Sequence, residues 1–143
     1  MPTFGAASRA ALATCHPDLI QVAEAAIRIY DFSVLQGHRS VADQQRLYKQ
    51  GRTTPGSIVT NIDGVIRKGK HNFYPSRAFD LAPYPLDWSD HESFLVLGGI
   101  VMAVAFQLGV ALRWGYDWDR DWNLVPRDPD ESFTDLPHFE VIL

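Results

Sequence analysis

Cysteine is nearly absent from this chain of 143 residues, in which Cys15 is the single one. One cysteine excludes an intramolecular disulfide and a zinc site built from cysteine ligands. Cys15 stands at a predicted helix junction, which favours a small buried residue over a nucleophile. The sequence also lacks the HExxH, GxSxG and P-loop motifs, so its chemistry must be sought in other patterns.

Positive charge is also scarce. Lys and Arg total 13 against 17 Asp and Glu, which gives a formal net charge of −4. This balance gives no electrostatic reason to bind nucleic acid or an anionic membrane, and we expect no nucleic-acid partner. The start of the chain, MPTFGAASRAALATC, lacks a basic segment followed by an apolar stretch, so we predict no secretory signal peptide.

The length fits one domain around one core, and no repeat or low-complexity linker divides the chain. Apolar spacing and capping residues predict helices early in the sequence, and short alternating runs predict strands. A stretch rich in Gly, Thr and Pro, residues 52–70, is predicted as a loop. The expected elements are helices over 16–30 and 40–51 and strands over 31–36 and 78–82.

Residues 94–112, FLVLGGIVMAVAFQLGVAL, form an apolar run of nearly transmembrane length. A membrane-anchored protein is therefore one alternative. A capping-box pattern begins at Ser89 and Gly109 suggests a stop, while Gly98 and Gly99 would let a buried helix pack closely on a sheet. Because strand and loop signals continue on both sides, we predict a core helix.

The tail from residue 112 is predicted as a polar, tryptophan-rich loop that ends in a strand after Pro137. Alternation along that strand separates two sets of side chains. One set is His138, Glu140 and Ile142, and the other is Phe139, Val141 and Leu143. The second set is apolar and should face the core.

His71, Asp80 and His138 are a candidate ligand set for catalytic zinc, which is usually held by three protein ligands with water in the fourth position. Asp135 could take the proton from that water. Arg39 could stabilise the negative charge that grows on a substrate oxygen. By spacing alone, each of these residues could equally be an ordinary hydrogen-bonded, turn or surface residue.

Four segments occur in an order that resembles the zinc D-alanyl-D-alanine carboxypeptidase and L-alanyl-D-glutamate endopeptidase family: GHRSVADQQRLYKQG, KHNFYPSRAFDLAPY, LRWGYDWD and DLPHFEV. The opening FGAASRAALATCHPDLIQVAEAAIRIYDFSV is similar to the start of phage and prophage members, so the resemblance covers nearly the whole chain. It implies an α+β fold of the Hedgehog/DD-peptidase type, with a small antiparallel sheet packed against helices. It also implies a single zinc peptidase domain over residues 1–143, without a separate wall-binding domain.

The resemblance assigns zinc binding to His71, Asp80 and His138, the general base to Asp135, and polarisation of the scissile carbonyl to Arg39. The commoner family pattern has the first His and Asp seven apart, with a serine two positions before the His. Here the gap is nine and glycine stands at the serine position. The longer gap resembles the phage-type variant.

Three further residues are candidates for substrate contacts. They are Ser76, Arg77 and Trp118. The first two lie inside the longer gap, where they could replace contacts made by the family's serine. The third belongs to a loop that we expect beside the substrate groove.

The implied function is a zinc-dependent peptidase that cuts the L-alanyl-D-glutamate bond of the peptidoglycan stem peptide, as a phage endolysin in host cell lysis. A single catalytic domain suits a thin, Gram-negative-type wall. We expect a monomer in the host bacterial cytoplasm that reaches the periplasmic wall after release by a holin. The alternatives are a D-alanyl-D-alanine carboxypeptidase and a non-catalytic zinc-binding module of the same fold, which would have no use for an acid at Asp135.

The segment DWDRDWN alternates oxygen ligands as the start of a calcium-binding loop does, with Asp117, Asp119, Asp121 and Asn123. The match to an EF-hand is incomplete, because position six is Trp122 instead of glycine and position twelve is Asp128 instead of glutamate. The simpler interpretation is a solvated acidic loop. The functional hypothesis is a weak Ca²⁺ site that orders the loop carrying Trp118 and Trp122.

Overall fold

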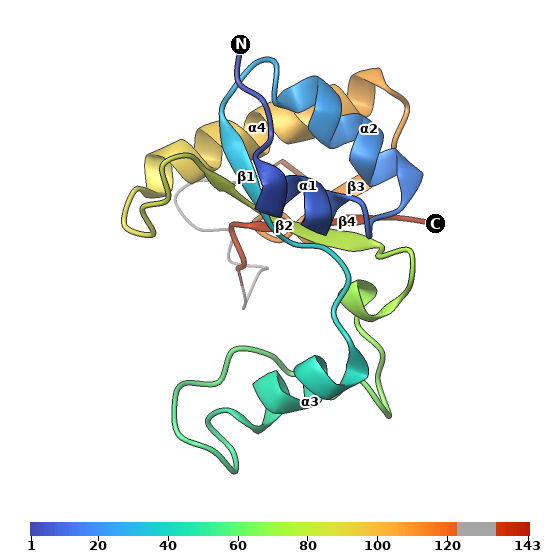
Figure 1. Cartoon of the computed structure of the whole chain (residues 1–143), viewed down its shortest axis with the longest axis vertical. Helices are drawn as coiled ribbons and strands as arrows, with labels where there is room; N and C mark the ends of the chain where they lie inside the picture. Colours follow the sequence, from blue (N-terminus) through green and yellow to red (C-terminus); the bar gives the residue numbers. More distant parts are fainter. Residues whose placement is uncertain (123–133) are drawn as a thin grey trace.

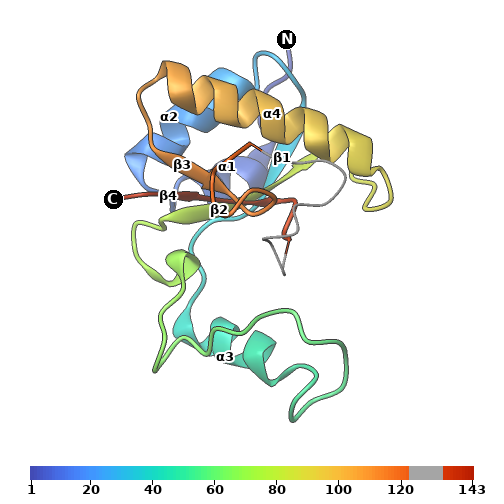
Figure 2. The same ribbon diagram turned by 180° about the vertical axis from the view of Figure 1, so that it is seen from behind.

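The computed structural model describes residues 1–122 and 134–143. The elements in chain order are α1 (Ala6–Leu12), α2 (Pro17–Ala26), β1 (Phe32–Gln36), α3 (Val41–Lys49), the 3₁₀ helix η1 (Lys70–Asn72), β2 (Ala78–Pro83), α4 (His91–Gln107), β3 (Leu112–Trp114) and β4 (His138–Val141). Helices α1, α2 and α4 gather on one side of the sheet, and α3 projects on the other side with the loop that follows it (Figure 1). Figure 2 shows the same separation from behind. The predicted α+β class is confirmed.

The sheet has four strands in the order β1-β2-β4-β3, and all neighbouring pairs are antiparallel. In the pairing of β2 with β4, Asp80 lies opposite His138. In the pairing of β1 with β2, the register shifts between Val34 and Gln36, so that Gln36 also lies opposite Asp80. Asp80 is therefore flanked on both sides by strand ends from distant parts of the sequence.

The hydrophobic core fills the space between the sheet and the helices α2 and α4. The buried strand residues of this face are Phe32, Val34, Phe79, Leu81, Leu112, Trp114, Phe139 and Val141. Alternation sends Asp80, His138 and Glu140 to the opposite face, toward α3. The predicted division of the last strand is confirmed for Phe139 and Val141, but it is wrong for Leu143, which is 69% exposed beyond the strand end.

The early elements follow the predictions with shorter bounds. The first predicted helix ends at Ala26, four residues early, and begins where the His16 ring accepts a hydrogen bond from the Asp18 backbone N–H. The second is capped by the Ser40 hydroxyl as predicted. Helix α1 and strand β3 were not predicted, because a seven-residue helix and a three-residue strand are too short to show a period.

Helix α4 confirms the predicted core helix. It begins with Asp90, whose carboxylate accepts a hydrogen bond from the Ser93 backbone N–H, so the expected cap at Ser89 is wrong. It ends as expected before Gly109, which adopts a positive φ of 72°. Among the described residues, no helix is long and apolar enough to cross a membrane.

The two adjacent glycines of α4 predict opposite effects of the same substitution. A Cβ on Gly98 would overlap the buried Trp114 ring, whereas a Cβ on Gly99 would meet no described atom within 4 Å. Gly98→Ala should therefore lower the free energy of unfolding by about 1–3 kcal/mol. Gly99→Ala is the matched control and should raise it by about 0.5–1 kcal/mol, since alanine has the higher helix propensity. Urea denaturation at fixed metal content measures both, and shifts of the same sign would contradict this packing.

Candidate active site

His71, Asp80 and His138 converge on the polar face of the sheet, and we call them the His–Asp–His cluster. The Nε2 atom of His71 lies 3.2 Å from Oδ1 of Asp80, and Nδ1 of His138 lies 3.3 Å from the same oxygen. The two imidazole rings are 5.1 Å apart between centroids. Both histidines are buried and Asp80 is partly exposed, so the cluster opens to solvent on the aspartate side.

Each histidine is oriented by a hydrogen bond from its other ring nitrogen. Nδ1 of His71 lies 2.8 Å from the Gly37 carbonyl oxygen, which can only accept, so this nitrogen carries the proton. Nε2 of His138 lies 3.0 Å from the Glu140 carboxylate and donates to it. Glu140 is in turn 3.7 Å from the guanidinium of Arg113. Such outer partners fix the tautomer and the ring direction of metal-binding histidines.

The cluster fits a zinc ion by chemistry and by size. Two imidazole nitrogens and a carboxylate oxygen are a common donor set of catalytic zinc. At zinc–ligand distances of about 2.0–2.1 Å, the donor atoms of a tetrahedral site lie roughly 3.3 Å from one another. The separations of 3.2 and 3.3 Å around Oδ1 of Asp80 match that value, and all three donor atoms lie within 4.8 Å of one another. Nitrogen ligands disfavour magnesium and calcium.

Burial and the neighbouring charges shift the pKa of the acids and of one histidine. Burial opposes ionisation of Asp80, but hydrogen bonds from His138 and His71 hold the pKa of this carboxyl well below its usual range. Burial alone would lower the pKa of His138, but its hydrogen bonds to Asp80 and Glu140 raise it to about 9. In the metal-free protein, His138 is therefore protonated at neutral pH.

Asp135 lies in the turn that leads into β4. Its backbone N–H donates to the Gly115 carbonyl at 2.6 Å, and its own carbonyl accepts from the His138 N–H at 3.2 Å. Burial and the nearby charge of Asp80 raise the pKa of the Asp135 carboxyl, and the positive charges of His138, His71 and Arg39 oppose this shift. The turn thus brings an acid with a raised pKa to the edge of the cluster.

Arg39 follows β1 and reaches the other side of Asp80, with its guanidinium 3.8 Å from Oδ2. Its backbone N–H donates to the His71 carbonyl, and its Nη1 donates to the side chain of Gln44 at 3.0 Å. Gln44 is buried and also donates to the Ile62 carbonyl at 2.8 Å. Helix α3 therefore holds both the arginine and the long loop after it.

The other expected substrate contacts lie in different surroundings. Ser76 is fully buried, and its hydroxyl donates to the Ala78 carbonyl at 2.6 Å, so it has no access to a substrate. Arg77 is partly exposed and its guanidinium stacks 4.0 Å from the Phe73 ring centroid. The ring of Trp118 lies 5.5 Å from the ring of His138, beside the cluster.

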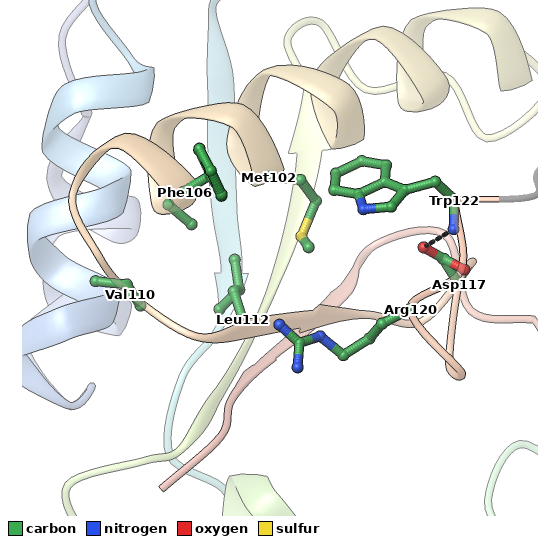
Figure 3. A pocket seen from close by; sticks show the side chains of 8 residues that line it. Met102, Phe106, Val110, Leu112, Asp117, Arg120 and Trp122 are labelled. Atoms are coloured by element: carbon green, nitrogen blue, oxygen red, sulfur yellow. Dashed lines mark hydrogen bonds between the residues drawn. The ribbon is translucent and has the colours of Figure 1, made fainter.

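Asp117, Asp119 and Asp121 also bring carboxylate oxygens within 4.8 Å of one another, and we call them the acidic loop. Asn123 and Asp128, the remaining predicted calcium ligands, lie outside the described residues. Figure 3 shows Asp117 accepting a hydrogen bond from the Trp122 backbone N–H, next to a pocket of about 200 Å³. Burial and the charges of the other two acids raise the pKa of Asp117 against that hydrogen bond.

A histidine–aspartate–histidine centre flanked by an acid and an arginine, on an α+β fold, defines a candidate metallohydrolase. The profile of the phage L-alanyl-D-glutamate peptidase family matches residues 2–142. The chain belongs to this family, which confirms the predicted resemblance.

Two relatives and one solved structure agree with this membership. The L-alanyl-D-glutamate peptidase of Escherichia phage T5 is 34% identical over 121 residues, which cover 81% of each chain. The peptidoglycan L-alanyl-D-glutamate endopeptidase CwlK of Bacillus subtilis (strain 168) is 31% identical over 126 residues, 84% of this chain and 66% of that protein. The crystal structure of the Serratia marcescens L-Ala D-Glu endopeptidase ChiX superposes with a TM-score of 0.69 at 23% identity, over 98% of this chain and 90% of that one, which shows a shared fold.

The residues that support the cluster were not predicted from the sequence. Glu140 was noted only as a member of the polar strand face, and Gln44 lies inside a helix that was predicted from its cap and stop alone. The signal for Glu140 was available, because a carboxylate two positions from a candidate ligand lies on the same strand face. Gln44 carried no such signal, since the groups that accept from its side chain, on Thr60 and Ile62, are 16 and 18 residues away in a loop segment.

The raised pKa of His138 predicts how metal affinity depends on pH. A metal needs the neutral imidazole, so below pH 9 it must displace a proton from His138. Zinc affinity of the metal-free protein should rise by about tenfold per pH unit from neutrality and level off near pH 9. Competition with a chromophoric chelator between pH 7 and 10 measures this.

A matched variant isolates the cause. In Glu140→Gln, an amide oxygen still accepts from Nε2 of His138 at the same place but carries no charge, so the pKa of His138 should fall. The affinity should then level off at a lower pH than in the wild type. An affinity that does not change between pH 7 and 9 in the wild type would contradict the protonated His138.

Proposed function

We propose that this chain is a zinc-dependent peptidoglycan endopeptidase that cuts the L-alanyl-D-glutamate bond of the stem peptide. The observation that carries the proposal is the His–Asp–His cluster, with donor separations that suit zinc, in a member of the phage L-alanyl-D-glutamate peptidase family. The names of the two relatives support the choice of the bond. Bound zinc would supply a Lewis acid that activates a water molecule and polarises the scissile carbonyl.

Asp135 acts as the general base and acid in this proposal. Its carboxylate accepts a proton from the attacking water and returns it to the nitrogen of the leaving amine. The raised pKa of Asp135 supports this role, because a base works best when its pKa approaches the working pH. A non-catalytic zinc module would have no use for this acid, which favours the enzyme.

Arg39 stabilises the oxyanion that forms as the carbonyl is attacked. The Arg39 side chain keeps 15% of its surface exposed and its guanidinium lies 3.8 Å from Oδ2 of Asp80, so it can donate to a substrate oxygen beside the cluster. Gln44 and Asp80 hold the guanidinium in place. The position is thus preorganised before substrate arrives.

Trp118 and Arg77 contact the substrate in this proposal. Trp118 packs against the His138 ring and would border the scissile bond. Arg77 follows Lys70 and Phe73 in a basic segment, which suits the free carboxylates of the stem after the scissile bond. Ser76 is left out because it is buried.

We further propose that the chain works as a monomer in lysis of a host bacterium. The relative from Escherichia phage T5 supports a phage endolysin. Such an enzyme would be made in the host cytoplasm and reach the periplasmic wall after a holin opens the inner membrane. Expression with and without a holin in a Gram-negative host tests this, since lysis without a holin would contradict it.

The acidic loop is proposed as a weak calcium site. Asp117 is buried, and its Oδ1 has no hydrogen-bond partner among the described residues. Trp122 stands where a calcium loop needs glycine, yet it adopts a φ of 64°, in the left-handed region that glycine normally occupies. A cation would relieve the repulsion among the three acids and stabilise one loop conformation.

The first prediction from this proposal separates base from ligand. Asp135→Asn should keep its zinc and its fold but lose roughly a hundredfold or more in hydrolysis, because an amide cannot accept the proton. Mass spectrometry of peptidoglycan digested by the wild-type enzyme should show peptides that begin with D-glutamate, and the variant should yield far less of them. His138→Ala is the control that should lose zinc itself.

Two outcomes would contradict this assignment. If the Asp135→Asn variant digests peptidoglycan at the wild-type rate, Asp135 is only a turn residue. Release of terminal D-alanine by the wild type would instead favour the D-alanyl-D-alanine carboxypeptidase.

The calcium proposal has its own test. Hydrolysis by the zinc-loaded enzyme should rise as calcium is titrated to millimolar concentration, and Asp119→Ala should respond less because one ligand is missing. Ser89→Ala, a substitution at an exposed residue outside the acidic loop, serves as the control that keeps the response. Equal rates at every calcium concentration in the wild type would leave the acidic loop as ordinary surface.

A further inference from the structure

A pocket of about 460 Å³ includes Asp135 in its wall. Thr134, Leu136 and Pro137 also line it from the segment before β4. Trp88 lines it from the loop between β2 and α4, and His91 and Phe94 line it from the first turn of α4. Because Asp135 is the proposed base, whatever fills this pocket lies next to the scissile bond. Which part of the substrate enters here is therefore a question that rests on the proposed function.

Trp88 and Phe94 form an aromatic platform in this pocket. Their rings are stacked, with centroids 5.4 Å apart and planes inclined by 17°. Phe94 belongs to the core and is 2% exposed, whereas Trp88 is 56% exposed. One face of the indole is thus held against the core while much of the ring remains accessible, which gives a flat apolar surface of fixed orientation.

A flat apolar surface suits only one part of the substrate. The stem peptide contains alanine, glutamate and a diamino acid, none of which has a planar or ring-shaped apolar face. The sugar that carries the stem does, because a pyranose presents a face of C–H groups that can stack on an indole. An exposed, preoriented tryptophan therefore favours the sugar over the peptide.

Charge favours the same choice. Asp135 is the one Asp or Glu among the described residues that line this pocket, and none of them is Lys or Arg. Asp87, Asp90 and Glu92 are sequence neighbours of the lining residues Trp88 and His91. The stem beyond the scissile bond carries free carboxylates, which these acids would repel. On the other side of the bond, L-alanine is joined by an amide to the lactyl group of the N-acetylated sugar, so this part is uncharged.

The basic residues lie at the other end of strand β2. Arg77 comes directly before β2 and Lys70 begins η1, whereas the segment with Trp88 follows β2. The two segments lie at opposite ends of the strand (Figure 1). A substrate that crosses the cluster can therefore direct its acidic part toward Arg77 and its neutral part toward Trp88.

We propose that Trp88 binds the N-acetylated sugar on the acyl side of the scissile bond, and that it makes this enzyme prefer stems still attached to glycan. Trp88 is thus a specificity-determining residue, with Phe94 as its support.

Two substrates with the same peptide test this proposal. One is a purified disaccharide–tetrapeptide, and the other is the same tetrapeptide with an acetylated N-terminus, which keeps that end neutral. Trp88→Ala should lower kcat/KM about tenfold on the disaccharide substrate and leave the acetylated peptide unchanged. Trp88→Phe should restore most of the loss, because it keeps an aromatic plane.

Phe106→Ala is the matched control, since Phe106 is also an exposed aromatic residue next to a pocket but lies toward the C-terminal end of α4. It should change neither rate. Zinc content and thermal unfolding of each variant show whether it is folded.

A second measurement does not depend on hydrolysis. The disaccharide without a stem should shift the NMR signal of the Trp88 indole N–H in the wild type, with the Trp114 signal as a buried reference. Equal losses on both substrates in Trp88→Ala, or no loss on either, would overturn the sugar assignment. A wild type that cuts neither substrate would refute the proposed function, while an unshifted Trp88 signal would refute the sugar platform by itself.

Discussion

The antiparallel register that sets Asp80 opposite His138 is the constraint on which the site depends. Directly paired residues of adjacent strands have Cβ atoms about 4.5–5.5 Å apart on the same face, which is close enough to share one ion. A shift of one residue would turn the ligands into the core and bring Phe79 and Phe139 to the polar face. The apolar packing that stabilises the sheet therefore also enforces the geometry of the cluster.

His71, the third proposed ligand, does not lie on a strand and is positioned by hydrogen bonds to backbone groups. His71 lies in η1, and its ring is held by Gly37 just after β1, where the register shift brings Gln36 opposite Asp80. The Arg39 N–H donates to the His71 carbonyl, and the Asn72 side chain donates to the Arg39 carbonyl. The segments around residues 37–39 and 71–72 have no periodic sequence pattern, and these hydrogen bonds fix them to each other. The bonds also satisfy polar groups that would otherwise be buried without partners.

These differences explain what the sequence could and could not predict. The strands β1, β2 and β4 alternate clearly and were predicted, and so was the apolar helix α4. The three ligands were chosen by residue type, but their convergence followed from a family resemblance, because no local pattern relates positions 71 and 138. Gln44 and the stacking of Trp88 on Phe94 were not foreseen, since they depend on where a loop and a helix start lie in space. Ser76 was misjudged because its hydroxyl satisfies the backbone of its own segment.

The buried acids of the site need a compensating positive charge. Asp80, Glu140 and His138 are mostly buried, and the proton held by His138 offsets the two acids as a cation would. The apolar core lies on the other face of the sheet and includes none of the three ligands. The core packing is thus separate from the proposed metal site, unlike in a zinc finger, where little core exists without the ion. A metal bound by the proposed ligands would replace this proton, and the hydrogen bonds that orient the two histidines would remain in place around it.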